Sequence, residues 1–288
     1  MKRSKASLLF DIFNHSFLGL VSLMAMIPFI YILIASITPP EILLKERFIL
    51  IPKGFSLEAY GYVLNTSTIT HALLVSICLT VTGTLFNLAM TVLFAYPLSH
   101  QGLYGRSMIT FMVVFTMMFS GGILPTYMVV RQLGLIDTYA SLILPGSIST
   151  FNLIIFRNFF QSLPAEIEES AKIDGANYPF ILSRIILPLS VPLLATFAVM
   201  YGVGIWNSWF SATLYLNSSD KWPIQVVLRQ IINLATRVGS EDIDVGVVVP
   251  QQSVRMVTII ITITPILLVY PFLQRYFTKG ILMGSIKG

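Results

Sequence analysis

The chain has 288 residues, of which 55% are hydrophobic and only 11% are charged. Because a soluble domain carries about 25% charged residues, this composition predicts an all-α integral membrane protein and excludes an ordinary soluble domain. The formal net charge is +5, and the basic residues are scattered along the chain, which argues against a nucleic-acid-binding face. The single cysteine, Cys78, excludes a disulfide within the chain.

About six segments are apolar and long enough to cross a bilayer as a helix, which takes about 20 residues. They are 12–37, 71–98, 108–130, 139–160, 182–210 and 256–277. The first is too long for a signal peptide and has no small-residue cleavage site before it, so we expect it to be retained. In the third, Ser120-Gly121-Gly122 and Pro125 predict a kink or a break. We expect one transmembrane domain over 1–288.

Basic residues near the ends of the spans indicate the orientation. The N-terminal tail, the connection with Arg106, the central loop 164–188 and the tail 279–288 all carry basic residues and lie on one side if there are six spans. We therefore expect both termini in the cytoplasm. The outer segments 38–70 and 211–254 have balanced charges. They suit contact with a binding protein, or a lid packed on the helix ends, and 223–238 has the pattern of an amphipathic helix.

Polar residues within the spans limit the mechanism. No Asp or Glu lies in the apolar centre of any span, whereas ion-coupled carriers usually rely on such groups. The chain also has no phosphate-binding loop of the G-x-x-x-x-G-K-[ST] type. A small and polar stripe on the second span favours helix packing over lining a path; it consists of Ser76, Thr80, Gly83, Thr84, Asn87 and Thr91.

The end of the fifth span is rich in aromatic residues. Tyr201, Trp206 and Asn207 are candidates for a carbohydrate path, because aromatic rings stack on sugars and amides bind hydroxyl groups. The alternative is an aromatic belt at the membrane surface. Asn152 in the fourth span is a further candidate, since a lone amide in an apolar helix needs a partner.

The most charged segment among the spans is the central loop, 164–188. Pro164 and the following glutamates are typical of a helix start, Gly175 of a helix stop, and Asn177 with Pro179 of a second start. The spacing therefore predicts two short helices joined at Gly175. Such a shape suits docking onto another protein; a solvated acidic loop is the alternative.

The same loop resembles the EAA loop of ABC importer permeases. The run Glu169-Ser170-Ala171, then Asp174-Gly175-Ala176, then Leu187-Pro188 matches that pattern, with Ser170 where the family has Ala. The resemblance implies a type I importer permease whose cytoplasmic loop docks on an ATPase. The residues it implicates in that contact are Glu168, Glu169, Ser170, Ala171, Asp174 and Gly175.

Further stretches resemble the maltose-type carbohydrate permeases, in their oligosaccharide branch linked to polysaccharide degradation. They include FSGGILPTY, WNSWFSATLYL and the Lys-Gly-ended tail. The resemblance implies a permease subunit of a binding-protein-dependent importer of oligosaccharides, with acidic (uronate) fragments among the candidates. It implies a bacterial cytoplasmic membrane location, a homologous second permease, two ATPase subunits that bind ATP and Mg, and a periplasmic or lipoprotein binding protein.

We expect no cofactor, no metal and no catalytic residue in this chain itself. Three other functions stay open. A secondary carrier or channel would work without an ATPase, and an ABC permease could serve another small solute. An intramembrane enzyme would need paired catalytic residues at depth, and the three histidines, His15, His71 and His100, are far apart in the sequence.

Overall fold

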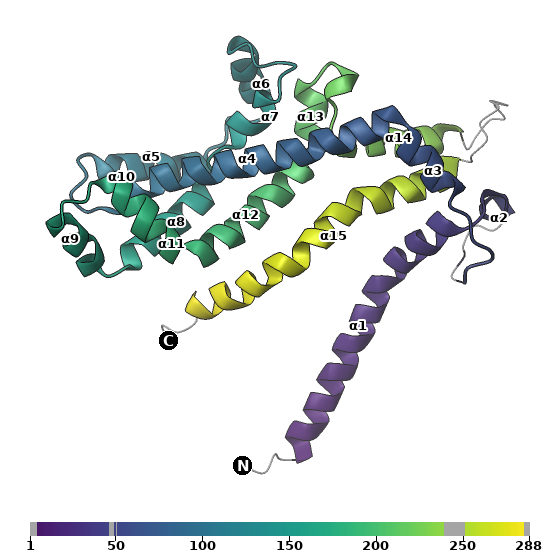
Figure 1. Ribbon diagram of the computed structural model, residues 1–288, viewed down its shortest axis with the longest axis horizontal. Helices are drawn as coiled ribbons and strands as arrows, with labels where there is room; N and C mark the ends of the chain where they lie inside the picture. The colour runs from purple at the N-terminus through teal and green to yellow at the C-terminus, as the bar shows by residue number, and fades with distance from the viewer. Residues whose placement is uncertain (1–4, 46–48, 50, 239–250, 285–288) are drawn as a thin grey trace. The chain divides into compact units, whose positions relative to one another are not determined.

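The computed structural model describes residues 5–45, 49, 51–238 and 251–284. The acidic patch 241–244 of the expected outer segment and the last residues of the tail, 285–288, lie outside this part of the chain. Every element in the described ranges is a helix (Figure 1). The chain divides into two compact units, Met1–Thr70 with Leu228–Thr264, and His71–Val227 with Pro265–Gly288.

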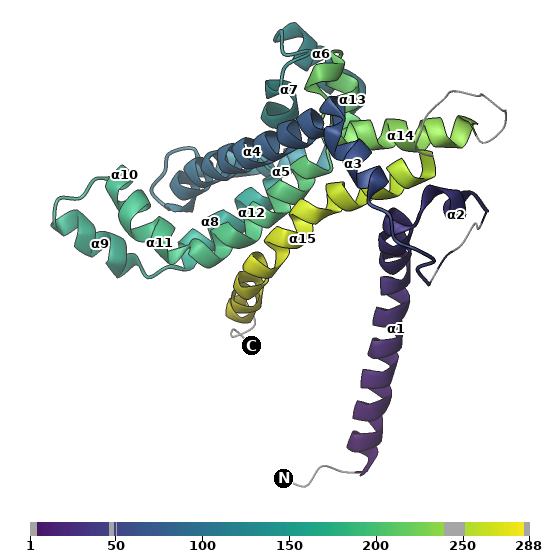
Figure 2. The ribbon, with the colours of Figure 1, turned by 45° about the vertical axis from the view of Figure 1, so that its right-hand side comes forward.

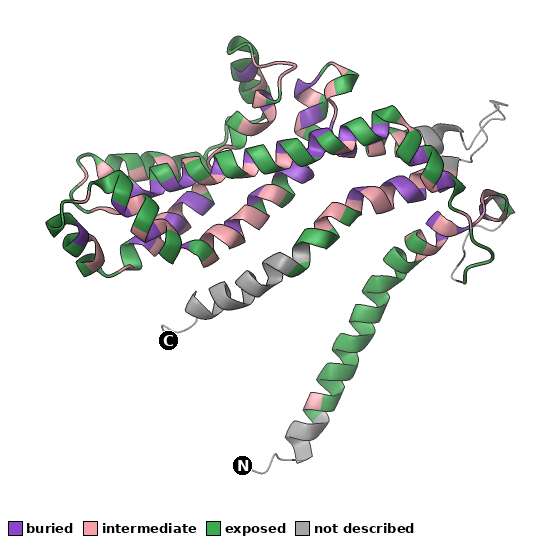
Figure 3. Cartoon of the chain, in the orientation of Figure 1, coloured by how far each residue is buried: buried purple, intermediate pink, exposed green. Residues whose placement is uncertain are grey.

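The first unit is built around α1 (Lys5–Ile37), which is apolar on all sides. Its described side chains are exposed along most of its length (Figure 3). Only its end is packed, where Ala35 is fully buried beside Leu43 of α2 (Pro40–Lys45). The Ser36 hydroxyl also lies 2.8 Å from the Tyr60 hydroxyl of α3 (Glu58–Asn65). An exposed apolar helix of this kind suits lipid or a partner helix as its surroundings.

The second unit holds most of the remaining helices. In chain order they are α4 (Ser67–Ser99), α5 (Arg106–Met118), α6 (Ile123–Gln132), α7 (Ala140–Ile143), η1 (Leu144–Gly146), α8 (Thr150–Ser162), α9 (Ala165–Ile173), α10 (Tyr178–Ile181), the π-helix η2 (Leu182–Ile186), α11 (Leu187–Leu189), α12 (Val191–Trp206), α13 (Trp209–Tyr215), η3 (Ser219–Lys221) and α14 (Ile224–Val238). The last helix, α15 (Gln251–Gly284), and α14 each contribute to both units. In two views α9 and α10 lie at one end of α4, whereas α6, α7 and α13 gather away from that end (Figures 1 and 2).

The core of the second unit lies between α4, α8 and the helices from α10 to α12. Phe156 is fully buried there, with its ring 5.0 Å from that of Phe197. Gly83 permits a close approach, because a Cβ at this position would lie 2.8 Å from the Ile205 Cδ1 atom. Ser76 accepts a hydrogen bond of 2.7 Å from the first amide of α14. Gly83 and Ser76 of the small and polar stripe thus serve helix packing.

Among the described residues, three helices are long and apolar enough to cross a membrane, and the number of spans rises to six if each bent pair of helices counts as one. The expected break at 120–122 is confirmed, since α5 and α6 meet there at 120° and Gly122 has φ +83°. The segments 139–160 and 182–210 were wrongly predicted as single helices. The first bends by 55° after Pro145 and Gly146, and the second by 83° next to Pro192. Hydropathy counts apolar residues and carries no information on direction, so it missed both bends.

The ends of the predicted spans also differ from the helices. The fifth ends at Trp206, and α13 follows as a separate helix where the prediction continued to Phe210. The sixth does not end at Phe277, because α15 continues through the start of the predicted tail to Gly284. The predicted amphipathic helix at 223–238 is confirmed by α14, whose Ile224 and Val227 are buried.

Candidate functional site

The central loop folds as two short helices joined at a glycine, as its sequence predicts. Helix α9 ends at Ile173, and Gly175 follows with φ +83°, a left-handed conformation that glycine adopts without steric cost. The Asn177 Oδ1 atom accepts a hydrogen bond of 3.0 Å from the Phe180 amide and caps α10. Local capping chemistry thus determines the shape of the loop.

The two faces of α9 have different surroundings. Ala171 is buried, and Ile167 and Glu168 are half-buried against the rest of the chain. The residues of the opposite face are exposed; these are Glu169, Ser170, Ile173 and Asp174, and Gly175 after them is exposed as well. Ile173 is 87% exposed. The face that a partner can reach therefore holds four of the six predicted coupling residues, while Glu168 and Ala171 face their own chain.

Glu168 anchors α9 to the end of α4. Its Oε2 atom lies 2.8 Å from the His100 Nε2 atom and 3.7 Å from the Lys172 Nζ atom. The His100 Nδ1 atom lies 2.9 Å from the Tyr96 carbonyl oxygen, so both ring nitrogens face an oxygen atom of the chain. The His100 ring also packs edge-on against Tyr96 and Tyr178. Sequence reasoning placed His100 at a span end without a role, because nothing in the sequence shows the pairing across 68 positions.

The end of α4 that holds His100 is itself tied to two other helices. The Leu98 carbonyl oxygen accepts hydrogen bonds from the Nε atoms of Arg106 on α5, at 3.0 Å, and Arg157 on α8, at 3.1 Å. The Ser99 carbonyl oxygen accepts another hydrogen bond from the side-chain Nε2 atom of Gln161, at 3.1 Å. Glu168 and His100 therefore connect α9 to a junction of three helices.

Tyr201, a predicted path residue, is buried and holds three helices together. Its hydroxyl lies 2.7 Å from the Thr91 hydroxyl on α4 and accepts a bond of 3.2 Å from the Ser149 amide at the start of α8. Asn152, also buried, lies in the first turn of α8, capped by the Ser149 hydroxyl at 3.5 Å. The structure thus brings the start of α8 and Tyr201 together, at a packed position.

The two other path candidates lie at the end of α12. Trp206 is buried and lines an apolar cavity of about 390 Å³ together with Thr80 and Thr84. Its indole N–H and both threonine hydroxyls have no hydrogen-bond partner among the described residues. Asn207 is exposed, and its side-chain Nδ2 atom donates a hydrogen bond of 3.0 Å to the Val203 carbonyl oxygen, which caps the end of its own helix. The four candidates do not form one cluster.

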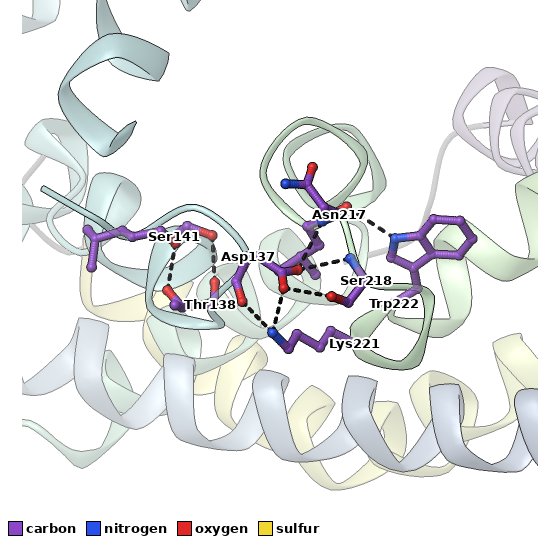
Figure 4. Close-up of polar contacts among 9 residues, drawn as sticks. Asp137, Thr138, Ser141, Asn217, Ser218, Lys221 and Trp222 are labelled. Atoms are coloured by element: carbon purple, nitrogen blue, oxygen red, sulfur yellow. Dashed lines mark hydrogen bonds and ion pairs between the residues drawn. The ribbon is translucent and has the colours of Figure 1, made fainter. Parts of the chain in front are cut away.

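A polar cluster that sequence reasoning missed joins the loop before α7 to the turn after α13 (Figure 4). We call it the Asp137 clasp; it consists of Asp137, Asn217, Ser218 and Lys221. The Asp137 carboxylate accepts bonds from the amides of Asn217 and Ser218, at 3.0 Å each, from the Ser218 hydroxyl at 2.7 Å and from the Lys221 ammonium at 2.6 Å. Asp137 has φ +60°, and its amide donates to the Tyr215 carbonyl oxygen at 2.8 Å.

These bonds shift the titration of both charged groups of the clasp. The Lys221 ammonium, followed by the Ser218 donors, holds the pKa of the Asp137 carboxyl well below its usual range. The Asp137 carboxylate in turn raises the pKa of the Lys221 ammonium. The clasp is therefore charged at neutral pH and fixes the loop before α7 to the turn after α13.

The chain is similar to known proteins over nearly its full length. The model of the family described as "Binding-protein-dependent transport system inner membrane component" matches residues 6–283. Protein LplC of Bacillus subtilis (strain 168) is 48% identical, with 100% of this chain and 98% of the relative covered. The polygalacturonan/rhamnogalacturonan transport system permease protein YtcP of the same organism is 48% identical, over 97% of this chain and 99% of the relative.

A solved structure has the same fold. It comes from the crystal structure of a bacterial ABC transporter involved in the import of the acidic polysaccharide alginate. One of its chains superposes with a TM-score of 0.88 at 32% identity, over 96% of this chain and 99% of that chain. Matches of this length, with the helical architecture described above, assign the family and the importer-permease fold. The chain belongs to the family of binding-protein-dependent transport system inner membrane components.

Proposed function

We propose that this chain is a permease subunit of an ATP-driven importer of acidic oligosaccharides. The observation that carries the proposal is its full-length similarity to two proteins named for acidic polysaccharides, the polygalacturonan/rhamnogalacturonan permease and the alginate importer. Polygalacturonan and alginate are both polymers of uronic acids, whose sugar rings each carry a carboxylate. Their common chemistry supports uronate fragments as the substrate class.

The coupling loop would dock on an ATPase subunit through the exposed face of α9. Glu169, Ser170 and Asp174 offer polar contacts there, and Ile173 offers an apolar side chain for a cleft in the partner. Glu168 and Ala171 would hold α9 on the permease side of the joint. This division of labour gives the loop one face for the ATPase and another for α4.

The complete importer would contain more subunits. A homologous second permease would complete the pathway, two ATPase subunits would bind ATP and Mg, and a solute-binding protein would deliver the sugar. In this arrangement α9 and both termini lie in the cytoplasm, and the Asp137 clasp faces the outside. The absence of acidic residues from the centres of the apolar spans supports ATP as the energy source.

Among the candidate path residues, Trp206 is better suited to contact the sugar than Tyr201 or Asn152. Tyr201 has its hydroxyl fully engaged by Thr91 and Ser149, whereas the Trp206 indole N–H is a buried donor without a described acceptor. A buried donor gains free energy when a ligand supplies its acceptor. Asn207, at the exposed end of α12, would meet a sugar only near the mouth of the path.

Charge reversal on the exposed face of α9 tests the assignment. We expect Glu169→Lys in the reconstituted importer to abolish uptake and reduce co-purification of the ATPase, because the docking face loses its carboxylate. Glu58→Lys, the same reversal on exposed α3, serves as the control and should leave the ATPase bound. Unchanged uptake and ATPase retention in Glu169→Lys would contradict the proposed coupling.

The substrate class needs a separate measurement. ATP hydrolysis by the wild-type complex would be followed with its binding protein and either galacturonate or neutral oligosaccharides of the same length. Stimulation by the acidic series supports the full proposal. Stimulation by the neutral series alone would retain the importer and refute the acidic substrate. Uptake that needs no ATPase subunit would favour the secondary carrier.

A further inference from the structure

Two arginines share one acceptor at the edge of an open pocket in the second unit. Arg106 and Arg157 both donate from Nε to the Leu98 carbonyl oxygen, at 3.0 and 3.1 Å. Their side chains line a pocket of about 600 Å³, together with the connection after α4 and the start of α5. Polar residues complete the lining, namely Gln101, Tyr104, Ser107 and Thr110. This volume is within the range of sites that bind small ligands.

The positive charge of this pocket has no counter-charge in the described part of the chain. The pocket lining contains no Asp or Glu, and no described carboxylate forms an ion pair with Arg106 or Arg157. Helix α5 adds to the same potential, because it begins at Arg106 with no acidic residue in its first turn and no side-chain cap. Two cations beside a helix N-terminus repel each other unless an anion lies between them.

The guanidinium groups also have unused donors. Each carries five N–H groups, of which only the one on Nε has an acceptor among the described residues. The bonds to the Leu98 carbonyl oxygen thus use one donor of each arginine, and the Nη groups keep no acceptor among the described residues. The Thr110 hydroxyl, a further member of the lining, is buried and has no partner in the same part of the chain. The pocket therefore offers several donors to an oxyanion.

The location of the pocket suggests where such an anion comes from. It lies between the end of one membrane-spanning helix, α4 at Ser99, and the start of the next apolar helix, α5 at Arg106. Chain at this position lies at the level of lipid headgroups, where anionic lipids attract arginines. Guanidinium groups bind phosphate through paired N–H···O bonds, and one phosphate can accept from both arginines.

We propose that the Arg106–Arg157 pocket binds a phosphate group, supplied by the headgroup of an anionic phospholipid or by phosphate in solution. The bound phosphate would neutralise the two guanidinium groups and fix the connection between α4 and α5. This site is distinct from the coupling face of α9 and does not depend on the proposed substrate.

The test compares lipid binding to the full-length chain, purified in detergent, by native mass spectrometry. Phosphatidylglycerol and phosphatidylcholine with identical acyl chains are titrated separately, and radiolabelled inorganic phosphate is titrated in a third arm. One variant is Arg106→Gln with Arg157→Gln. A second, Ser107→Glu, keeps both arginines and their bonds to Leu98 but places a carboxylate in the pocket, at a helix position that favours it. Arg184→Gln removes an exposed arginine outside the lining as the control.

We expect the wild-type chain to prefer phosphatidylglycerol over phosphatidylcholine by about tenfold or more, the effect of one charge-assisted hydrogen bond. Both pocket variants should lose the preference, and Arg184→Gln should retain it. If millimolar inorganic phosphate displaces the lipid and binds only where both arginines are present, the phosphate comes from solution. If it does not displace the lipid, the headgroup is the ligand. No preference and no phosphate binding in the wild type, or a preference that survives in both pocket variants, would overturn the proposal.

Discussion

Removing the His100 ring should loosen α9 from the rest of the second unit. His100→Ala deletes the 2.8 Å contact with Glu168. The His100 side chain is only 24% exposed and the Glu168 side chain 19%. A hydrogen bond to a charged group contributes about 1.5–3 kcal/mol, and partial exposure to water favours the lower end of that range. Since 1.36 kcal/mol corresponds to a factor of ten, local opening of α9 should become about tenfold more frequent.

Hydrogen–deuterium exchange measures this opening directly. Amides of α9 should exchange about tenfold faster in His100→Ala, and amides of α12 should be unchanged, because the rest of the core is intact. Glu166→Gln, which removes an exposed carboxylate from the same helix, should leave α9 exchange as in the wild type. In the reconstituted importer, His100→Ala should lower the sugar transported per ATP hydrolysed.

A double-mutant cycle separates this contact from general damage. His100→Ala and Glu168→Gln should each accelerate exchange, and the double variant should accelerate it little further, because both remove the same interaction. Additive effects, or α9 exchange at the wild-type rate in His100→Ala, would refute the role of this pair in anchoring the loop.

Two further predictions concern the clasp and the core. Asp137→Asn keeps a residue that tolerates positive φ but removes the charge, so its melting temperature should be lower than that of the wild type at pH 7. The pKa of Asp137 is lowered by folding, so its stabilisation is fully present above the ordinary value of about 3.9 and is lost as the pH falls through the lowered folded value; a difference between the two proteins that grew on acidification would contradict this. Tyr201→Phe leaves the Ser149 amide without its acceptor and should cost about 1–3 kcal/mol of stability, measured as a lower melting temperature in detergent. Loss of transport at unchanged stability would instead favour a sugar contact for Tyr201.

Local chemistry made part of the fold readable from the sequence. Gly175 and Asn177 determine the two-helix shape of the coupling loop through left-handed backbone and capping, and both effects depend only on neighbours in the chain. Likewise the Gly122 region predicts the break between α5 and α6. The predictions of these features were correct because the features depend on no distant residue.

The sequence did not predict features that depend on which way a helix face points or on partners distant in the chain. Glu168 and Glu169 are adjacent, and a helix turns by about 100° between them; which one faces the bundle depends on where His100 lies. The six-residue coupling set is therefore split by the structure into an outward and an inward group. The pairing of Asp137 with Lys221 arises in the same way from tertiary packing.

The Asp137 clasp also has a consequence for biosynthesis. Its acceptor and its donors are 80 to 84 positions apart, with α7 to α13 between them. At synthesis rates of about 5–20 residues per second, Asp137 is synthesised roughly 4–17 s before Lys221. Until then its carboxylate has only water and local groups as partners. The clasp can close only after the intervening helices have been inserted, so its formation reports that this hairpin of the chain has reached its correct topology.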